Sequence, residues 1–163
     1  MKPTRIMDVL DLAYEARKQG RTFIPIFTGA AGIGKSQICQ LWVEKHKKTN
    51  KNFGFIDLRS ALLEGPDVIG RPKESTDHTG RIRTTYALPD FWPTEGEGLI
   101  LLEEINRAPT MVTNCFMQLL TDRMVKDYKL PDGWIIAAAI NPDSAEFDVK
   151  DRKSTRLNSS HRT

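Results

Sequence analysis

A glycine-rich stretch, GAAGIGKSQ at residues 29–37, follows a short apolar run and precedes a helical pattern. The spacing Gly29-x-x-x-x-Gly34-Lys35-Ser36 is typical of a phosphate-binding loop between a buried strand and a helix. Its glycines let backbone N–H groups converge on phosphate oxygens, and the following helix presents its positive end to the same point. The stretch therefore predicts an α/β fold with one anion site between a strand and a helix.

The chemistry of this loop indicates a bound nucleotide with Mg²⁺. Lys35 is expected to reach the β- and γ-phosphates, and the hydroxyl of Ser36 is expected to bind the metal. The predicted nucleotide-binding residues are Gly29, Ala30, Ala31, Gly32, Ile33, Gly34, Lys35, Ser36 and Gln37.

Three further apolar runs alternate with helical patterns along the chain. The runs are FGFIDL at 53–58, LILLEE at 99–104 and WIIAAAIN at 134–141, and helices are expected over 4–18, 35–48 and 109–123. Continuous apolar runs are typical of parallel strands buried on both faces. The alternation predicts a three-layer core, with a parallel sheet between two layers of helices. Residues 60–97 are rich in Gly and Pro and are expected to be mainly loop.

Polar side chains end two of these strands. Glu103 and Glu104 close the third apolar run, and Asn141 closes the fourth. Ligands of parallel α/β sheets bind at the carboxyl ends of the strands. We therefore expect Glu103 to contact Mg²⁺, Glu104 to act as the general base toward a water, and Asn141 to hold that water. Together with Lys35, Glu104 and Asn141 are the predicted catalytic residues.

The net charge of +3 belongs to the end of the chain. Residues 151–161 read as the translation of a common sequencing-library adapter, so we expect residues 151–163 to be an adapter-derived tail outside the fold. The tail holds four of the 24 basic and one of the 21 acidic residues, which leaves residues 1–150 with no net charge. Composition therefore does not support nucleic-acid binding.

The hydropathy of the chain, its N-terminal residues and its cysteines and histidines bear on location and metal content. No apolar run approaches the roughly 18 residues that a membrane span needs, and residues 1–20 lack the apolar stretch of a signal peptide. We expect a cytoplasmic protein with no membrane partner. The two cysteines and three histidines show no ligand spacing, so a structural metal is not expected.

Taken together, these segments resemble the MoxR-like, dynein-related group of AAA+ ATPases over roughly residues 22–149. The segments that carry the resemblance are GIGKSQ, IDLRSALLEGPDVIGRP, LLEEINRAP, LLTDRMVKDYKLPDGW and IIAAAINPD. It implies an ATP-hydrolysing remodelling enzyme with ATP and Mg²⁺ as cofactors.

The resemblance also implies roles for single residues. Lys35 and Ser36 match the Walker A motif, Glu103 and Glu104 match Walker B, and Asn141 matches sensor 1. Arg107 and Arg123 match arginines of the group, either with a role in its motif or as surface ion pairs. The chain departs from the group at Ala30 and Ala31, where proline is usual, and at Glu103, where aspartate is usual.

The resemblance further implies a sheet order of 5-1-4-3-2 and a ring, commonly a hexamer. The fifth strand, the arginine finger, sensor 2 and the helical lid are expected beyond residue 150, so residues 1–150 would be a partial AAA+ domain. We expect the 163-residue product to be poorly soluble and to hydrolyse ATP negligibly. The implied partners are other subunits, a protein client and a protein with a von Willebrand A-type domain. Residues 62–94 and a hairpin in RMVKDYKLPDG are expected to be contact regions or ordinary connections.

Two other functions stay open at this point. A GTPase or a small-molecule kinase would share the phosphate loop, but a GTPase needs a guanine-reading Asn-Lys-x-Asp, and residues 50–53 read NKNF too early in the chain. A metabolite kinase usually lacks two adjacent glutamates after the third strand. A non-catalytic nucleotide-binding scaffold has no need of a base at Glu104.

Overall fold

The computed structural model of the chain describes residues 3–142. The expected tail, residues 151–163, and the elements expected beyond residue 150 lie outside the described residues. Within residues 3–142, no helix combines the length and the apolar character needed to cross a membrane.

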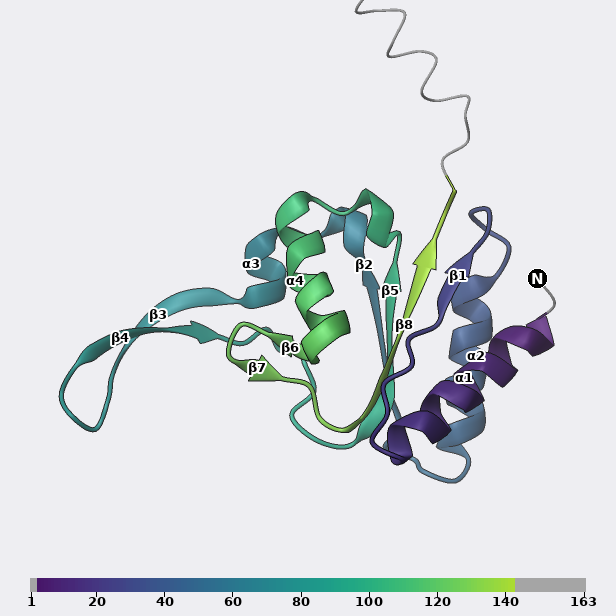
Figure 1. Cartoon of the computed structure of the whole chain (residues 1–163), viewed down its shortest axis with the longest axis horizontal. Helices are drawn as coiled ribbons and strands as arrows, with labels where there is room; N and C mark the ends of the chain where they lie inside the picture. The colour runs from purple at the N-terminus through teal and green to yellow at the C-terminus, as the bar shows by residue number, and fades with distance from the viewer. Residues whose placement is uncertain (1–2, 143–163) are drawn as a thin grey trace, which may run out of the picture.

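Four parallel strands form the central sheet (Figure 1). In spatial order they are β1 (Ile26–Thr28), β8 (Gly133–Ile140), β5 (Glu97–Glu103) and β2 (Gly54–Arg59). This order matches the expected 1-4-3-2 part of the AAA+ sheet. β1 pairs on one side with β8, and among the described residues its other edge carries no strand.

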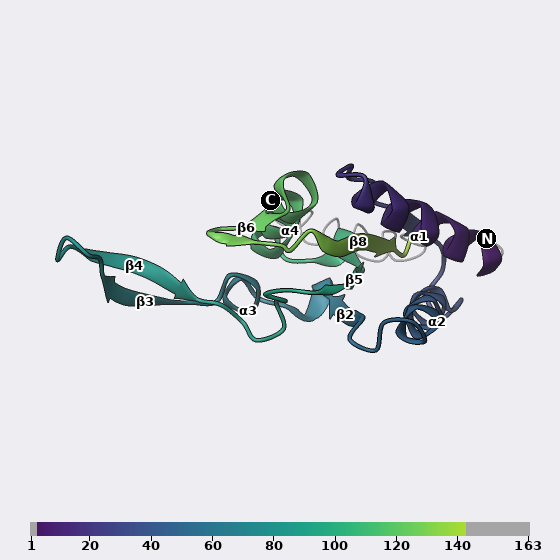
Figure 2. The ribbon, with the colours of Figure 1, turned by 90° about the horizontal axis from the view of Figure 1, so that it is seen from below.

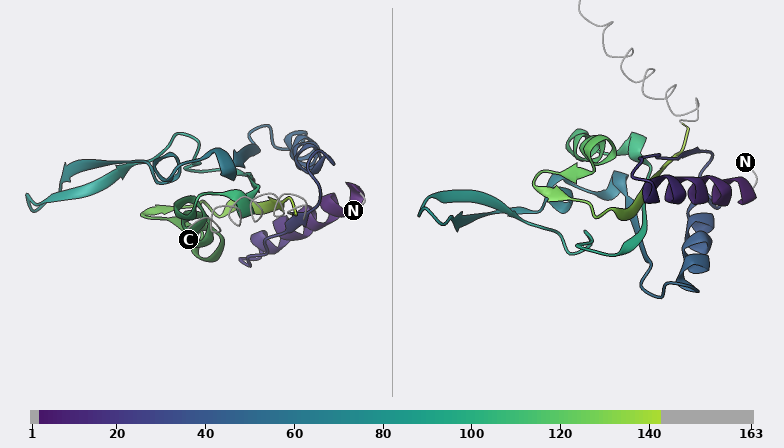
Figure 3. Two further views of the ribbon diagram at one scale, coloured as in Figure 1. Left: turned by 90° about the horizontal axis from the view of Figure 1, so that it is seen from above. Right: turned by 60° about the horizontal axis from the view of Figure 1, so that its bottom comes forward.

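Helices cover both faces of the sheet (Figures 1 and 3). One layer holds α1 (Pro3–Lys18) and α2 (Lys35–Lys47), and the other holds α3 (Gly65–Ile69) and α4 (Thr110–Asp122). Successive residues of a strand point to opposite faces, so Leu99 and Leu101 pack with the α1–α2 layer, and Ile100 and Leu102 with the α3–α4 layer. All four are fully buried. The predicted three-layer α/β core is confirmed.

The segment between β2 and β5 differs from the expected loop. After the short 3₁₀ helix η1 (Ser60–Leu62) and α3, strands β3 (Arg71–Thr76) and β4 (Ile82–Ala87) pair antiparallel and project from the body (Figures 1 and 2). Most residues of both strands are exposed, so they lack the alternation of apolar and polar residues that marks a half-buried strand. A second hairpin, β6 (Met124–Val125) with β7 (Tyr128–Lys129), lies where the sequence predicted one.

Candidate nucleotide-binding site

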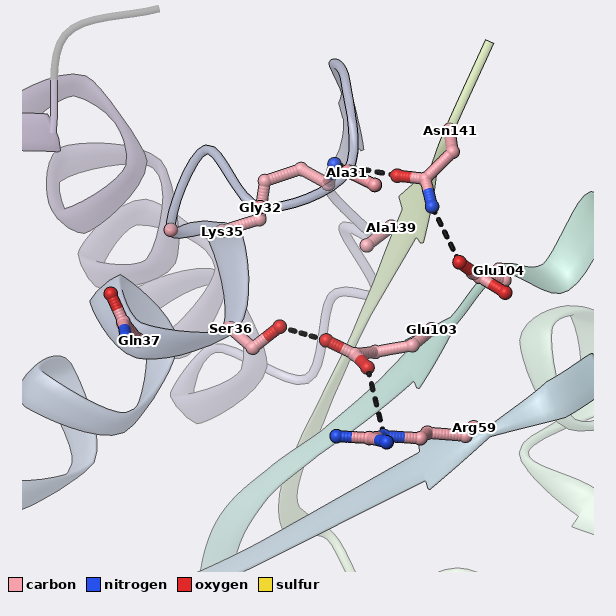
Figure 4. A pocket seen from close by; sticks show the side chains of 11 residues that line it. Ala31, Gly32, Lys35, Ser36, Gln37, Arg59, Glu103, Glu104, Ala139 and Asn141 are labelled. Atoms are coloured by element: carbon pink, nitrogen blue, oxygen red, sulfur yellow. Dashed lines mark hydrogen bonds and ion pairs between the residues drawn. The ribbon is translucent and has the colours of Figure 1, made fainter. Parts of the chain in front are cut away.

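A cavity of about 320 Å³ opens at the carboxyl ends of the central strands (Figure 4). It lies between the loop that follows β1 and the ends of β2, β5 and β8. Its lining consists of Ala31, Gly32, Gly34, Lys35, Ser36, Gln37, Arg59, Glu103, Glu104, Ala139 and Asn141.

The loop between β1 and α2 has the backbone of an anion cradle. Gly32 and Gly34 adopt positive φ angles of 78° and 87°, a region that glycine enters without steric cost. Helix α2 begins directly after Gly34, which offers no side chain to cap it. The N–H groups of its first turn therefore remain available for phosphate oxygens, and the helix dipole favours a negative charge at this point.

Lys35 places a cation beside this cradle. The residue is only 9% exposed, and its Nζ donates to the carbonyl oxygens of Gly29 at 2.5 Å and Ala30 at 2.9 Å. Nζ also donates to Oδ1 of Asn141 at 2.8 Å. These three acceptors hold the ammonium group in place and engage all three of its N–H donors, so a phosphate oxygen would replace one of them.

Ser36 and Glu103 face each other across the cavity floor (Figure 4). The hydroxyl of Ser36 donates to Oε1 of Glu103, and Nε of Arg59 lies 3.7 Å from Oε2. Burial raises the pKa of Glu103, as does the neighbouring carboxylate of Asp57, whereas Arg59 acts in the opposite direction. A partly buried carboxylate beside other acids is a group that a cation would stabilise.

This oxygen pair fits the chemistry of Mg²⁺. Mg²⁺ prefers oxygen ligands and usually takes one or two from protein, with the rest supplied by water and phosphate. Across residues 3–142 there is no cluster of three or more His, Cys, Asp or Glu side chains that could hold a metal alone. Ser36 and Glu103 thus suit a metal that arrives with a nucleotide.

Glu104 and Asn141 lie on the other side of the cavity. Nδ2 of Asn141 donates to Oε1 of Glu104 at 2.6 Å, and the backbone N–H of Glu104 donates to the carbonyl of Ala139 at 2.8 Å. Glu104 has a φ of 53°, a left-handed conformation that is uncommon outside glycine and that concentrates at functional sites. The side chain of Asn106 supports the arrangement by donating to the carbonyl of Asn141 at 3.1 Å.

Most of the residues predicted from sequence come together here. The cavity lining includes six of the nine predicted nucleotide-binding residues together with Glu103, Glu104 and Asn141. Gly29 and Ala30 contribute through the carbonyl groups that hold Lys35, and the side chain of Ile33 is 53% exposed and is not part of the lining. Sequence reasoning missed Arg59, the last residue of β2, and Ala139, the last but one residue of β8, although both lie at the edge where ligands were expected.

The two arginines left open by the sequence lie outside the cavity lining. Arg123 is buried, and its Nη2 donates to the carbonyls of Pro131 at 2.9 Å and Trp134 at 2.7 Å. Trp134 stands near the start of β8, at the end of that strand opposite Asn141, so Arg123 ties α4 to the base of the sheet rather than forming a surface ion pair. Arg107 lies in the 3₁₀ helix η2 (Ile105–Arg107) and is exposed.

No family model and no curated protein matches the sequence of the chain. Its fold does match solved structures of RuvB from Thermotoga maritima. One RuvB point mutant gives a TM-score of 0.54 at 12% identity, over 86% of this chain and 40% of that chain. A second point mutant gives 0.53 at 12% identity, over 90% and 42%. The structure described as the RuvB Holliday junction branch migration motor gives 0.51 at 13% identity, over 85% and 38%.

The chain therefore spans about two fifths of the length of these structures. The described residues share the fold of these structures, with its parallel sheet between layers of helices. At this level of identity the likeness concerns the fold alone.

Proposed function

We propose that this protein binds ATP with Mg²⁺ and hydrolyses it as an AAA+ ATPase of the MoxR-like group. The observation that carries the proposal is the hydrogen-bonded series Lys35–Asn141–Glu104 on one wall of the cavity. It brings together a cation at the start of α2, an amide directly after β8 and a carboxylate directly after β5. A site for binding alone needs the cation but not the carboxylate.

Binding would depend on the loop and on Lys35. Backbone N–H groups at the start of α2 and the ammonium of Lys35 both favour the phosphate oxygens of a nucleoside triphosphate. Ser36 and Glu103 would hold Mg²⁺, which neutralises negative charge on the phosphates when it is bound. The AAA+ fold supports ATP as the nucleotide, in preference to the GTPase and kinase alternatives.

Hydrolysis would depend on Glu104 and Asn141. Glu104 would take a proton from a water that attacks the γ-phosphorus, so that ATP and water yield ADP and phosphate. Asn141 holds the carboxylate of Glu104 through its amide N–H, while its amide oxygen is engaged with Lys35. The position of the base is thereby tied to the side chain that contacts the phosphates.

At the level of the whole protein, we propose that hydrolysis occurs in a ring of subunits and remodels a protein client in the cytoplasm. A von Willebrand A-domain protein is the proposed partner. Sequence resemblance supports this part of the proposal. The β3–β4 hairpin, which extends from the body as an isolated pair of strands, offers a surface for such contacts (Figure 2).

The direct test compares the native full-length protein with a Glu104→Gln variant. Under single-turnover conditions, we expect the variant to hydrolyse ATP about 10²- to 10⁴-fold more slowly, as for loss of a general base, with unchanged ATP affinity. Glu15→Gln, an exposed glutamate in α1, is the matched control and should hydrolyse at the native rate. Equal rates for the native protein and Glu104→Gln would remove Glu104 as the base, and ATP binding without hydrolysis would instead indicate a scaffold.

A further inference from the structure

Arg59 belongs to the cavity although no phosphate-binding motif includes it. It is the last residue of β2, and the parallel register of the sheet pairs it with Glu103, the last residue of β5. Its guanidinium group extends along the cavity floor toward Glu103 (Figure 4). Two strand ends therefore bring a cation and a carboxylate to the same place.

Glu103 is held from two sides. Its Oε1 accepts a hydrogen bond from Ser36 at the start of α2, and its Oε2 lies 3.7 Å from Nε of Arg59. The side chain of Glu103 is 17% exposed, whereas that of Arg59 is 72% exposed. The contact thus joins a mostly exposed guanidinium group to a mostly buried carboxylate.

The charged groups around Glu103 also favour a cation beside its carboxylate. Asp57 and Glu104 act on Glu103 as like charges, and Lys35 and Arg59 act as opposite charges. The ammonium of Lys35 is already engaged by Asn141 and by two loop carbonyls. Within the described part of the chain, Arg59 is the basic side chain in ion-pair contact with Glu103.

We infer that Arg59 is a positioning residue that holds the Glu103 carboxylate in place for the divalent cation of a metal–nucleoside triphosphate complex. This inference rests on the proposed function. A glutamate side chain has three rotatable torsions, so its carboxylate can take several positions. With Oε2 turned toward Arg59, Oε1 stays directed at Ser36, and the two oxygens expected to bind the metal remain side by side.

The test measures metal affinity in the presence of nucleotide and nucleotide affinity in the absence of metal. Binding of a fluorescent ATP analogue to the full chain is titrated with Mg²⁺ and repeated in EDTA, and Mn²⁺ binding in the presence of nucleotide is followed by electron paramagnetic resonance. We expect Arg59→Ala to raise the metal concentration at half-saturation by about tenfold. This is the lower end of the loss of metal affinity expected when a residue that supports a metal ligand is removed. Its affinity for the nucleotide in EDTA should equal that of the native chain.

Three further variants make the result specific. Arg83→Ala removes an arginine of similar exposure, 64%, that pairs with Asp77 in the projecting hairpin, and it should leave metal affinity unchanged. Arg59→Lys keeps the charge and should recover part of the metal affinity. In a Glu103→Gln background, Arg59→Ala should have no further effect, because the two residues act through one contact.

The possible outcomes separate this inference from the proposed function. Native metal dependence in Arg59→Ala, or equal effects in the native and Glu103→Gln backgrounds, would overturn the role of Arg59 and leave ATP binding standing. An equal loss of nucleotide affinity with metal and in EDTA would also overturn it and would make Arg59 a phosphate contact. Failure of the native chain to bind the analogue at all would overturn both proposals.

Discussion

Nζ of Lys35 lies 2.8 Å from Oδ1 of Asn141, although 106 positions separate the two residues in the chain. The contact joins the loop after β1 to the end of β8, two strands that pair side by side in the sheet. Because Asn141 also donates to Glu104, one amide links the cation of the phosphate loop to the candidate base. A change in the position of the Lys35 side chain would therefore alter the position of Glu104 through Asn141 alone.

The first prediction concerns this amide. In the full-length protein, Asn141→Ala should lower the single-turnover rate of ATP hydrolysis by about 10²-fold, since a polar group that orients the reacting atoms is lost. It should also lower the free energy of unfolding by about 1–3 kcal/mol, because Lys35 and Glu104 each lose a buried partner. Rapid quench and urea denaturation measure the two effects.

Asn50→Ala is the control for this change. Asn50 also joins an amide to a carboxylate, that of Glu97 at 3.0 Å, but it stands outside the cavity lining. Its replacement should reduce stability and leave hydrolysis at the native rate. Native hydrolysis by Asn141→Ala would show that the amide does not act on the reaction.

A second prediction separates backbone strain from binding. Gly32 in the phosphate loop and Gly80 at the tip of the β3–β4 hairpin have nearly equal φ angles, 78° and 80°, and a Cβ at either would meet no atom within 4 Å. Replacing either by alanine should cost about 1–2 kcal/mol, the price of the left-handed conformation. Isothermal titration with ATP should show weaker binding for Gly32→Ala alone. Equal affinities for the two variants would exclude the loop as the phosphate cradle.

A third prediction concerns the pH dependence of stability and involves His46, which is not part of the cavity lining. The ring of His46 packs among Tyr14, Trp42 and Phe53, and burial lowers its pKa from 6.5, opposed by the carboxylate of Asp11. The unfolded chain therefore binds a proton at higher pH than the folded one, so stability falls as pH decreases through the ordinary histidine range. Because of His46, the free energy of unfolding should therefore increase with pH over a range just below pH 6.5.

Urea denaturation at a series of pH values tests this increase. The pH dependence of the free energy of unfolding should become smaller in His46→Gln, because glutamine does not titrate. It should be unchanged in His78→Gln, which alters an exposed residue near the tip of the β3–β4 hairpin. An identical pH dependence in the native chain and His46→Gln would contradict the assignment.

The sequence was sufficient to predict the sheet and the main walls of the site. The continuous apolar runs of β5 and β8 are typical of buried parallel strands, and the glycine spacing fixes the loop between β1 and α2. Because parallel strands end at one edge, the polar residues that close them, Glu103, Glu104 and Asn141, had to lie near the phosphate loop. The order of the four strands followed from the family resemblance rather than from the residues alone.

Other features depend on contacts that no pattern encodes. The β3–β4 hairpin is exposed on both faces and so lacks an apolar period, which is why it read as a loop. Arg59 joins the site through the β2–β5 register, and a single arginine at the end of a strand gives no local signal for that pairing. The two roles of Asn141, as acceptor from Lys35 and donor to Glu104, require side-chain positions that only the packed sheet defines.

The central claim, that the cavity between these strand ends holds a magnesium nucleotide, is tested most directly by equilibrium titration of the full chain with a fluorescent ATP analogue. The native chain should bind with saturation, and Lys35→Ala should bind about tenfold to a hundredfold more weakly through loss of a charged contact to the phosphates. Lys47→Ala, at the other end of α2 and paired with Glu44, should bind as the native chain does. No saturable binding by the native chain, or equal binding by the native chain and Lys35→Ala, would contradict the account.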